Sequence, residues 1–440
     1  MPNSPAPDLL KALYNALPLS AHLGMDLDAI YVQRADDAEH DSVAKLRQYI
    51  EWSEDGNESY LFSGLRGAGK TTELLKLMQV LKADGIATFY CDAADYLNLH
   101  DPEIGLPELL MTAMAGLADA VRKEFGAALL KDSIWQRAKR LLASDVALKP
   151  SVSVPINGVE FGVEATLQEN PDFRKALAKF ARSSTAFYDE VNDFAAAVAA
   201  VIRQEKRCEK IVLLVDSLER LSAPSGEESK LFDSLKEVFF NDPARLRFAG
   251  FSVIYSAPPY LHAVLPNVAA GFTQCVSLPN FKVIEKPSGV EQPQPSDAGI
   301  AKMLEVLAHR FPQWESVLSR AVAQHLAFMS GGNVRSYFSL LRILALKAKL
   351  SQAALPINET DAAAVAHTLS EAAQPLQWLN AQDRIWLKHF MNSAVKPASH
   401  ILDMAKDLPS IIRLFDHSLV LDYKNGEIWY QVPPLVREHV

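Results

Sequence analysis

Residues 63–72 read SGLRGAGKTT, and this stretch decides the fold that we expect for the chain. Within it, Gly64–Thr71 matches the pattern G-x-x-x-x-G-K-[ST] at every position. In such a loop the backbone N–H groups cradle phosphates, the lysine reaches the β- and γ-phosphates, and the next hydroxyl ligates Mg²⁺. The pattern predicts a nucleoside triphosphate site in which Lys70 is the main cation and Thr71 binds the metal. We expect the Lys70 side chain to serve the ligand and to matter little for folding.

The flanking sequence places this loop between a strand and a helix. Residues 59–63 form a short run typical of a buried strand, and residues 72–81 carry apolar side chains at helical spacing. The amino end of that helix adds partial positive charge to the anion site. The alternative is a Gly-rich turn that binds nothing. We expect ATP and Mg²⁺ as cofactors, and the nucleotide-binding residues are Gly64, Leu65, Arg66, Gly67, Ala68, Gly69, Lys70, Thr71 and Thr72.

Composition narrows the class of protein. The 440 residues allow two or three domains, and 49% hydrophobic with 22% charged residues is typical of globular proteins. A net charge of −9 argues against a surface built throughout to hold nucleic acid, but leaves room for a local basic patch. The scattered residues Cys91, Cys208 and Cys275 suit a reducing cytosol. With no long apolar run and no signal-like start, we expect a cytoplasmic protein without a membrane partner.

A second acidic motif complements the loop. Residues 210–216 form an apolar, β-rich run that ends in Asp216, and we expect this strand next to the strand of the phosphate-binding loop. An acid at the carboxyl end of such a strand holds Mg²⁺, directly or through water. Because Ser217 stands where many ATPases have a glutamate, either Glu219 serves as the base or hydrolysis is slow. The alternative for Glu219 is a solvated acid paired with Arg220.

The other strands complete an α/β core with a parallel sheet. Residues 86–92, 248–256 and 273–278 read as strands, and Ser256 either faces the γ-phosphate or merely caps its strand. The rest of this region predicts a helical stretch over 106–142 interrupted near Gly126, a hairpin over 150–165 around Asn157, and a long helix over 172–205.

Beyond a Pro-rich linker the pattern becomes helical. Gly331 and Gly332 end one helix, Asn333 caps the next, and Arg335 in its first turn suggests an anionic partner. In the amino-terminal part, residues 31–34 either line the bottom of an adenine pocket or form a loop with a purely structural role. The helices expected outside the core cover 8–17, 41–52, 298–309, 314–329 and 334–350.

The carboxyl-terminal residues predict a winged helix, with helices over 380–390, 397–405 and 408–416 and strands over 419–423 and 428–432. The last helix offers only Arg413 among acidic neighbours, so we expect a protein contact more than DNA reading. The domains expected are an N-terminal helical segment (1–57), the α/β core (58–284) with an insertion at about 100–205, a linker (285–296), a helical lid (297–372) and a winged-helix domain (373–440).

With these motifs in place, the chain resembles the AAA+ and STAND classes of P-loop ATPases. The resemblance covers about residues 28–440. In it, Val212–Glu219 is similar to the acidic strand, Ser256 lies at the first sensor position and Gly331–Arg335 at the second. Two departures are Ser217 and the Pro258–Pro259 pair, where STAND proteins often carry an arginine. The catalytic residues that follow from the motifs and the resemblance are Lys70, Asp216, Glu219, Ser256 and Arg335.

The resemblance implies an ATP-hydrolysing regulatory ATPase that switches or forms a homo-oligomer with ATP. Such a protein works with a separate effector, as in bacterial defence against phage and in signalling. An arginine supplied by a neighbouring copy is expected, with Arg245 or Arg247 as candidates. The alternative is a DNA-handling initiator or transposition-type ATPase that grips DNA through the winged helix. A metabolic kinase is disfavoured, because a lid and a winged helix occupy the place of a substrate domain.

Overall fold

The computed structural model divides the chain into two compact units. The loop unit comprises Met1–Asp41, Gly64–Leu75 and Leu278–Val440, and the sheet unit comprises Ser42–Ser63 and Lys76–Ser277. Helix α4 (Lys70–Ala83) contributes to both. The residues that the structure describes are 8–19, 26–35, 40–54, 56–126, 137, 171–265, 267–287, 293–373, 376, 379–392, 403 and 406–440.

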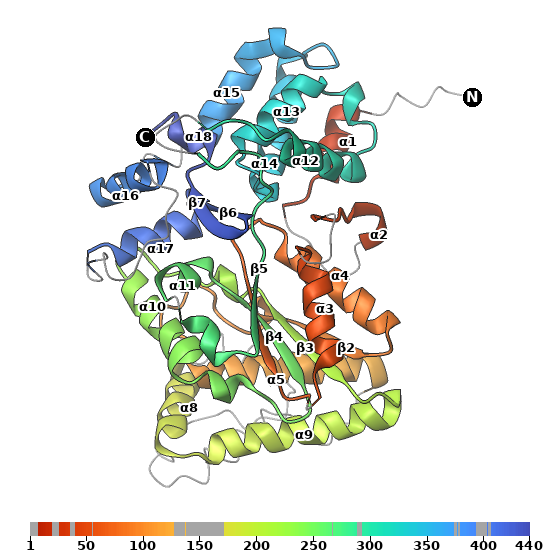
Figure 1. Ribbon diagram of the computed structural model, residues 1–440, viewed down its shortest axis with the longest axis vertical. Helices are drawn as coiled ribbons and strands as arrows, with labels where there is room; N and C mark the ends of the chain where they lie inside the picture. The colour runs from red at the N-terminus through yellow and green to blue at the C-terminus, as the bar shows by residue number, and fades with distance from the viewer. Residues whose placement is uncertain are drawn as a thin grey trace. The chain divides into compact units, whose positions relative to one another are not determined.

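A five-stranded parallel sheet forms the centre of the sheet unit (Figure 1). Its order is β2-β3-β4-β1-β5. Every residue of β1, β3 and β4 is buried, as expected for parallel strands covered on both faces. The strands are β1 (Ser59–Ser63), β2 (Ala87–Asp92), β3 (Ile211–Asp216), β4 (Ser252–Ala257) and β5 (Gln274–Ser277).

The strand order corrects one expectation. The acidic strand β3 does not lie next to β1, because β4 pairs with both of them. Phe62 of β1 is in register with Ser256 of β4, and Asp92 of β2 is in register with Asp216 of β3. The lengths of the connections between strands do not reveal that β4 lies between β1 and β3, because a long crossover connection can place a parallel strand beside either neighbour.

The helices of the sheet unit begin and end where local signals favour it. Helix α5 ends at Phe125, before Gly126 with a φ of 94°, as predicted for the interruption near that residue. The long helix expected over 172–205 is wrong, because α8 and α9 are separate. Ser184 breaks the run, and its Oγ accepts a hydrogen bond from Ala186 N at the start of α9. The helices are α3 (Ser42–Trp52), α5 (Leu106–Phe125), α8 (Pro171–Ser183), α9 (Ala186–Lys206), α10 (Glu228–Lys236) and α11 (Pro259–Val264).

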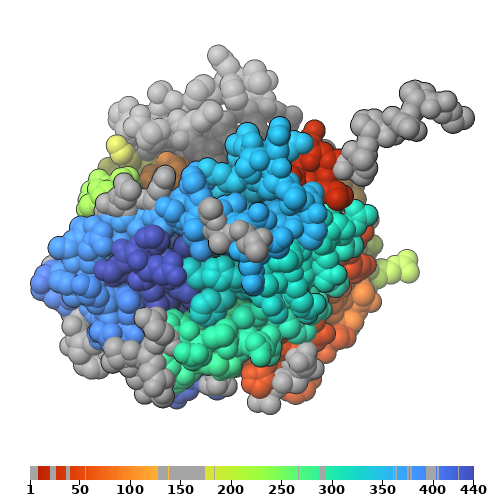
Figure 2. Space-filling view, turned by 90° about the horizontal axis from the view of Figure 1, so that it is seen from above, coloured from red at the N-terminus to blue at the C-terminus, as the bar shows by residue number. Residues whose placement is uncertain are grey.

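Helices dominate the loop unit. The helix expected over 314–329 is wrong as a single element, because a 3-10 turn (Trp314–Ser316) precedes α13, whose start Ser319 caps. The short C-terminal α18 packs against α13 and α15, and Figure 2 shows it in dark blue among these lid helices. The helices of this part are α1 (Leu9–Ala16), α2 (Leu27–Ile30), α12 (Asp297–Arg310), α13 (Arg320–Met329), α14 (Val334–Ser351), α15 (Ala362–Ala373) and α18 (Pro434–Arg437).

A two-helix and hairpin segment matches most of the predicted winged helix. It contains α16 (Ala381–Asn392), α17 (Leu408–Asp416), β6 (Leu421–Asn425) and β7 (Glu427–Gln431). The strands β6 and β7 pair antiparallel around Gly426. The helix expected over 397–405 and the hairpin expected over 150–165 lie outside the described residues. Among the residues that are described, none of the helices is long and apolar enough to cross a membrane.

Candidate nucleotide-binding site

The phosphate-binding loop has the backbone that its sequence predicts. Gly67 and Gly69 have φ values of 78° and 107°, which L residues with side chains rarely adopt. Helix α4 begins immediately afterwards at Lys70. The amino end of this 14-residue helix, with its free N–H groups and partial positive charge, favours binding of an anion.

Lys70 is more closely held by the protein than the sequence indicates. Its side chain is buried, and its Nζ donates to the carbonyl oxygens of Gly64 at 2.7 Å and Leu65 at 2.9 Å. The ammonium therefore satisfies two carbonyls of its own loop. That Lys70 matters little for folding stays a prediction, but its removal would leave Gly64 O without this donor and Leu65 O with only the bond from Ala68 N among the hydrogen bonds described, so we expect a modest loss of stability.

Three consecutive carbonyls of the loop accept hydrogen bonds from other segments of the loop unit. Arg66 O accepts from Asn333 Nδ2 at 2.9 Å and from Ser418 Oγ at 3.3 Å. Gly67 O accepts from Arg335 N at 3.2 Å, and Ala68 O accepts from the Arg34 guanidinium. The lid, the C-terminal hairpin segment and the N-terminal segment each fix one part of the loop backbone.

The N-terminal segment packs on α4 through two side chains. Arg34 Nε and Tyr31 OH both donate to the Glu73 carboxylate at 3.1 Å. Arg34 also donates to Pro279 O at 2.8 Å and stacks on the Phe281 ring. Burial, with help from the Glu73 charge, raises the pKa of Tyr31. These contacts favour the structural-loop interpretation of residues 31–34 over an adenine floor.

Arg335 contacts the phosphate-binding loop through its backbone amide. Its amide binds Gly67 O, while its Nε donates to Leu19 O at 3.0 Å. The Asn333 side chain also bonds to the loop, and its Oδ1 caps α14 by accepting from Ser336 N. The sequence predicts the cap but not the second role of this asparagine. A direct contact between Arg335 and phosphate stays a prediction.

The acidic strand end lies in the sheet unit and is fully buried. Asp216 Oδ2 accepts from Tyr90 OH at 2.8 Å, and Oδ1 accepts from Ser217 N at 2.7 Å. Burial, with help from the charge of Asp216, raises the pKa of Tyr90, so this phenol remains a donor to the carboxylate. Tyr90 was not identified from the sequence. Its position on the neighbouring strand β2 is visible only once the sheet order is known.

Glu219 and Ser256 flank this acid. Glu219 lies in a 3-10 turn after β3 and is only 6% exposed, so the alternative of a solvated surface acid is wrong. Ser256 is buried at the end of β4, and its Oγ accepts from Leu218 N at 2.9 Å. Ser217 between them has a φ of 70°, a strained value for a serine. The turn that carries Glu219 is thus tied to the strand between β3 and β1.

These residues fit the cofactors expected from the sequence. Mg²⁺ in nucleotide sites takes one or two carboxylates together with substrate phosphates, and needs no cage of protein ligands. In the part of the chain that the structure describes, no group of three or more His, Cys, Asp or Glu could hold a metal by itself. The roles of Thr71 and Asp216 in holding Mg²⁺ stay predictions.

A glycine beside this network provides a stability test. Gly332 has a φ of 81°, and a Cβ built there lies 1.9 Å from Phe281 O. We expect Gly332→Ala to lower the free energy of unfolding by more than about 3 kcal/mol, because backbone strain and overlap add. Gly426→Ala is the matched control, since its φ is 77° but nothing lies within 4 Å. Equal melting temperatures for the two variants would contradict the close approach.

Comparisons with known proteins relate the chain to solved structures only. No family model matches it, and no curated protein matches it. The ORC2 protein of Aeropyrum pernix, solved with ADPNP and ADP, is 14% identical over 93% of this chain and 95% of its own, with a TM-score of 0.40. The Cdc6p protein of Pyrobaculum aerophilum is 13% identical over 94% and 96%, with a TM-score of 0.36. The ORC1 protein of Aeropyrum pernix in complex with DNA is 13% identical over 94% and 94%, with a TM-score of 0.37.

The fold assignment rests on the chain's own features. A parallel sheet carries a strand that runs into a G-x-x-x-x-G-K-T loop, and a helical region and a C-terminal hairpin follow it. The chain therefore has the P-loop ATPase fold that its AAA+ resemblance predicts.

Proposed function

We propose that this chain binds ATP with Mg²⁺, hydrolyses it and changes conformation with the state of its nucleotide. The observation that carries the proposal is the set of bonds to the carbonyls of Arg66, Gly67 and Ala68. In this proposal Lys70 binds the β- and γ-phosphates, Thr71 and Asp216 hold Mg²⁺, and Glu219 orients the attacking water.

The carbonyl contacts give a physical route from nucleotide to conformation. A ligand shifts a conformational equilibrium only if it interacts differently with the two states. Phosphates bind the same short loop whose carbonyls bond to Asn333 of the lid and Ser418 before β6. A shift of the loop backbone on phosphate binding would therefore change the hydrogen bonds that Asn333 and Ser418 donate to Arg66 O.

We further propose that ATP favours assembly of several copies and contact with a separate effector. The insertion at about 100–205 and the winged-helix segment are candidate partner surfaces. Particle mass should differ among the full chain with ATP, with ADP and with a non-hydrolysable ATP analogue. An identical monomer mass in all three states would contradict switching by self-assembly. The defence role implied by the STAND resemblance stays a prediction.

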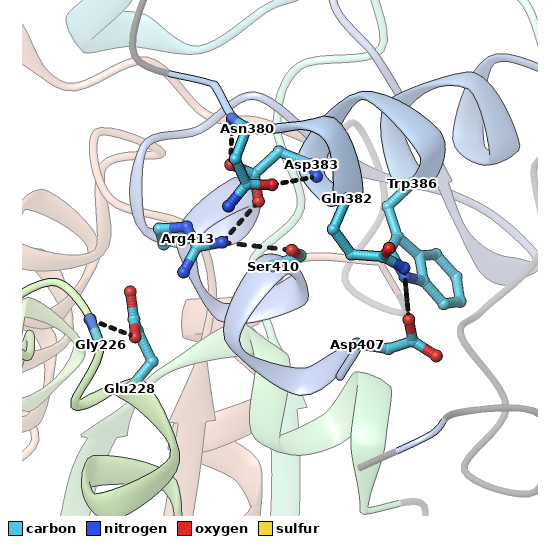
Figure 3. Close-up of polar contacts among 9 residues, drawn as sticks. All are labelled: Gly226, Glu228, Asn380, Gln382, Asp383, Trp386, Asp407, Ser410 and Arg413. Carbon is cyan, nitrogen blue, oxygen red and sulfur yellow. Dashed lines mark hydrogen bonds and ion pairs between the residues drawn. The ribbon is translucent and has the colours of Figure 1, made fainter. Parts of the chain in front are cut away.

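DNA handling is the second candidate role, as the initiator resemblance of the sequence implies, and the ORC1 protein of Aeropyrum pernix compared above was solved in complex with DNA. Residues 371–440 include seven Lys or Arg and eight Asp or Glu, so this segment has no net positive charge that would favour contacts with DNA phosphates. Figure 3 shows the only basic residue of α17, Arg413, pointing at Asp383 of α16. Their atoms lie 2.7 Å apart, and Asp383 is fully buried.

Arg413 should therefore act on stability more than on DNA affinity. We expect Arg413→Ala to lower the free energy of unfolding by about 3–5 kcal/mol, because it leaves a buried carboxylate without its cation. The double variant Asp383→Asn with Arg413→Gln is the control, since it removes both charges and should recover most of the loss. Fluorescence titration of the full chain with duplex DNA completes the test. Submicromolar binding by the parent, with a steep salt slope that the double variant flattens, would favour the initiator role instead.

A further inference from the structure

Tyr90 of β2 lies on the same face of the sheet as Asp216 of β3. In this parallel pair of strands, Tyr90 is in register with Leu214, and Asp92 is in register with Asp216. Side chains two positions apart on a strand point to the same face, so Tyr90 and Asp216 share one face with an offset of two residues. Two residues span about 6–7 Å of strand. The long phenol bridges this offset, and its hydroxyl donates to Asp216 Oδ2 at 2.8 Å.

The Asp216 carboxylate is held at both of its oxygens. Oδ2 accepts from Tyr90 OH, and Oδ1 accepts from Ser217 N at 2.7 Å. Ser217 begins the turn after β3, and the next amide of this turn, Leu218 N, donates to Ser256 Oγ. The last torsion of an aspartate side chain is otherwise loosely defined. Two donors from different strand ends, one on each oxygen, therefore fix the orientation of this carboxylate.

Both of these donors are electrically neutral, which matters for the binding of a cation. A phenol and an amide orient the carboxylate without cancelling its charge, whereas a lysine or arginine would compete with a metal ion for it. A carboxylate has about four acceptor positions, so two hydrogen bonds are compatible with a metal ion on the same group. Hydrogen-bonding partners of metal-binding carboxylates orient the ligand, and their loss typically lowers metal affinity about 10- to 100-fold.

We propose that Tyr90 is a positioning residue for the metal site, whose hydroxyl holds the Asp216 carboxylate in the orientation that binds the Mg²⁺ of MgATP. The inference rests on the proposed function and adds to it a residue outside both sequence motifs. The alternative is a core tyrosine of β2 whose hydroxyl has Asp216 as its acceptor and has no influence on the metal. The two interpretations differ in one measurable quantity, which is the increase in ATP affinity on addition of Mg²⁺.

The test is Tyr90→Phe in the full chain, which removes one hydroxyl and keeps the ring. Titration calorimetry measures ATP affinity in excess Mg²⁺ and again in EDTA, and the ratio of the two affinities is the increase due to the metal. We expect this ratio to fall by about tenfold, or to be lost, because the carboxylate loses one of its two orienting donors. ATP affinity in EDTA should stay within a factor of two of the parent, since no contact with the phosphates is changed.

Tyr96→Phe is the matched control. Tyr96 OH also donates to a carboxylate of the sheet unit, Asp119 Oδ2 at 3.0 Å, but this acid lies on α5 and not at the end of a strand. The control should keep the ratio of the parent. A Tyr90→Phe protein with the same ratio as Tyr96→Phe would overturn the inference and leave the ATPase proposal intact.

Asp216→Asn separates failure of this inference from failure of the proposed metal site. The variant should lose the increase in ATP affinity on addition of Mg²⁺, because its amide carries no charge for the metal. An Asp216→Asn protein with the ratio of the parent would contradict the metal role of Asp216 and overturn the inference with it. If the parent chain binds no ATP, the proposed function itself fails.

Discussion

Lys70→Ala should lose at least about a hundredfold in ATP affinity. The lysine is the side chain that the motif assigns to the β- and γ-phosphates, and charge-assisted hydrogen bonds contribute about 1.5–3 kcal/mol each. Titration calorimetry with MgATP measures the loss. Because Lys70 also donates to Gly64 O and Leu65 O, we expect the melting temperature to fall by a few degrees.

Two variants separate loss of the ligand contact from loss of folding. Lys76→Ala removes a lysine six positions later on α4, whose Nζ donates to Gln79 Oε1 at 2.9 Å, and it should retain ATP affinity. Lys70→Arg keeps the charge and should recover part of the binding. A folded Lys70→Ala protein that still binds ATP with micromolar affinity would contradict the nucleotide site.

Glu219→Gln should bind ATP normally and hydrolyse it about a hundredfold or more slowly. The amide has the shape of the carboxylate but cannot accept a proton from water. Loss of a general base typically lowers the turnover rate by about a hundredfold or more. Because Glu219 is buried in the turn after β3, the substitution changes a group inside the protein and not a solvated one. A phosphate-release assay at saturating MgATP measures the effect.

Glu205→Gln is the control, because Glu205 is exposed near the end of α9. Its turnover should equal that of the parent chain. If Glu219→Gln turned over within a factor of two of this control, Glu219 would have no part in hydrolysis, and another group would have to orient the water.

The sequence predicts those parts of the molecule that depend on local patterns. The P-loop, the ends of β1 and the full extent of α17 follow from residue spacing, and the structure confirms them. The cap at Asn333 follows from residue type. The insertion of β4 between β1 and β3 could not be predicted in this way, because it depends on long-range pairing and leaves no local pattern.

The contacts of the site were harder to predict than its motifs. Tyr90 reaches Asp216 from a strand more than a hundred positions earlier, and Asp422 is joined to Asn280 across 142 positions. Arg335 shows the same limit in another form. Its place in the first turn of α14 is predicted correctly, but the hydrogen bond from its Nε goes to Leu19 O, a backbone atom that no motif identifies.

Hydrogen exchange tests the central claim that nucleotide state is transmitted from the P-loop to the C-terminal hairpin. The full chain is compared with saturating ADP and with a saturating non-hydrolysable ATP analogue, and exchange is followed over residues 64–75 and 421–431. We predict that the amides of β6 and β7 exchange at different rates in the two states, because Asn333 and Asn280 connect Arg66 O of the loop to Asp422 of β6 by hydrogen bonds. Identical exchange over 421–431 in both states, with both nucleotides bound, would contradict the account.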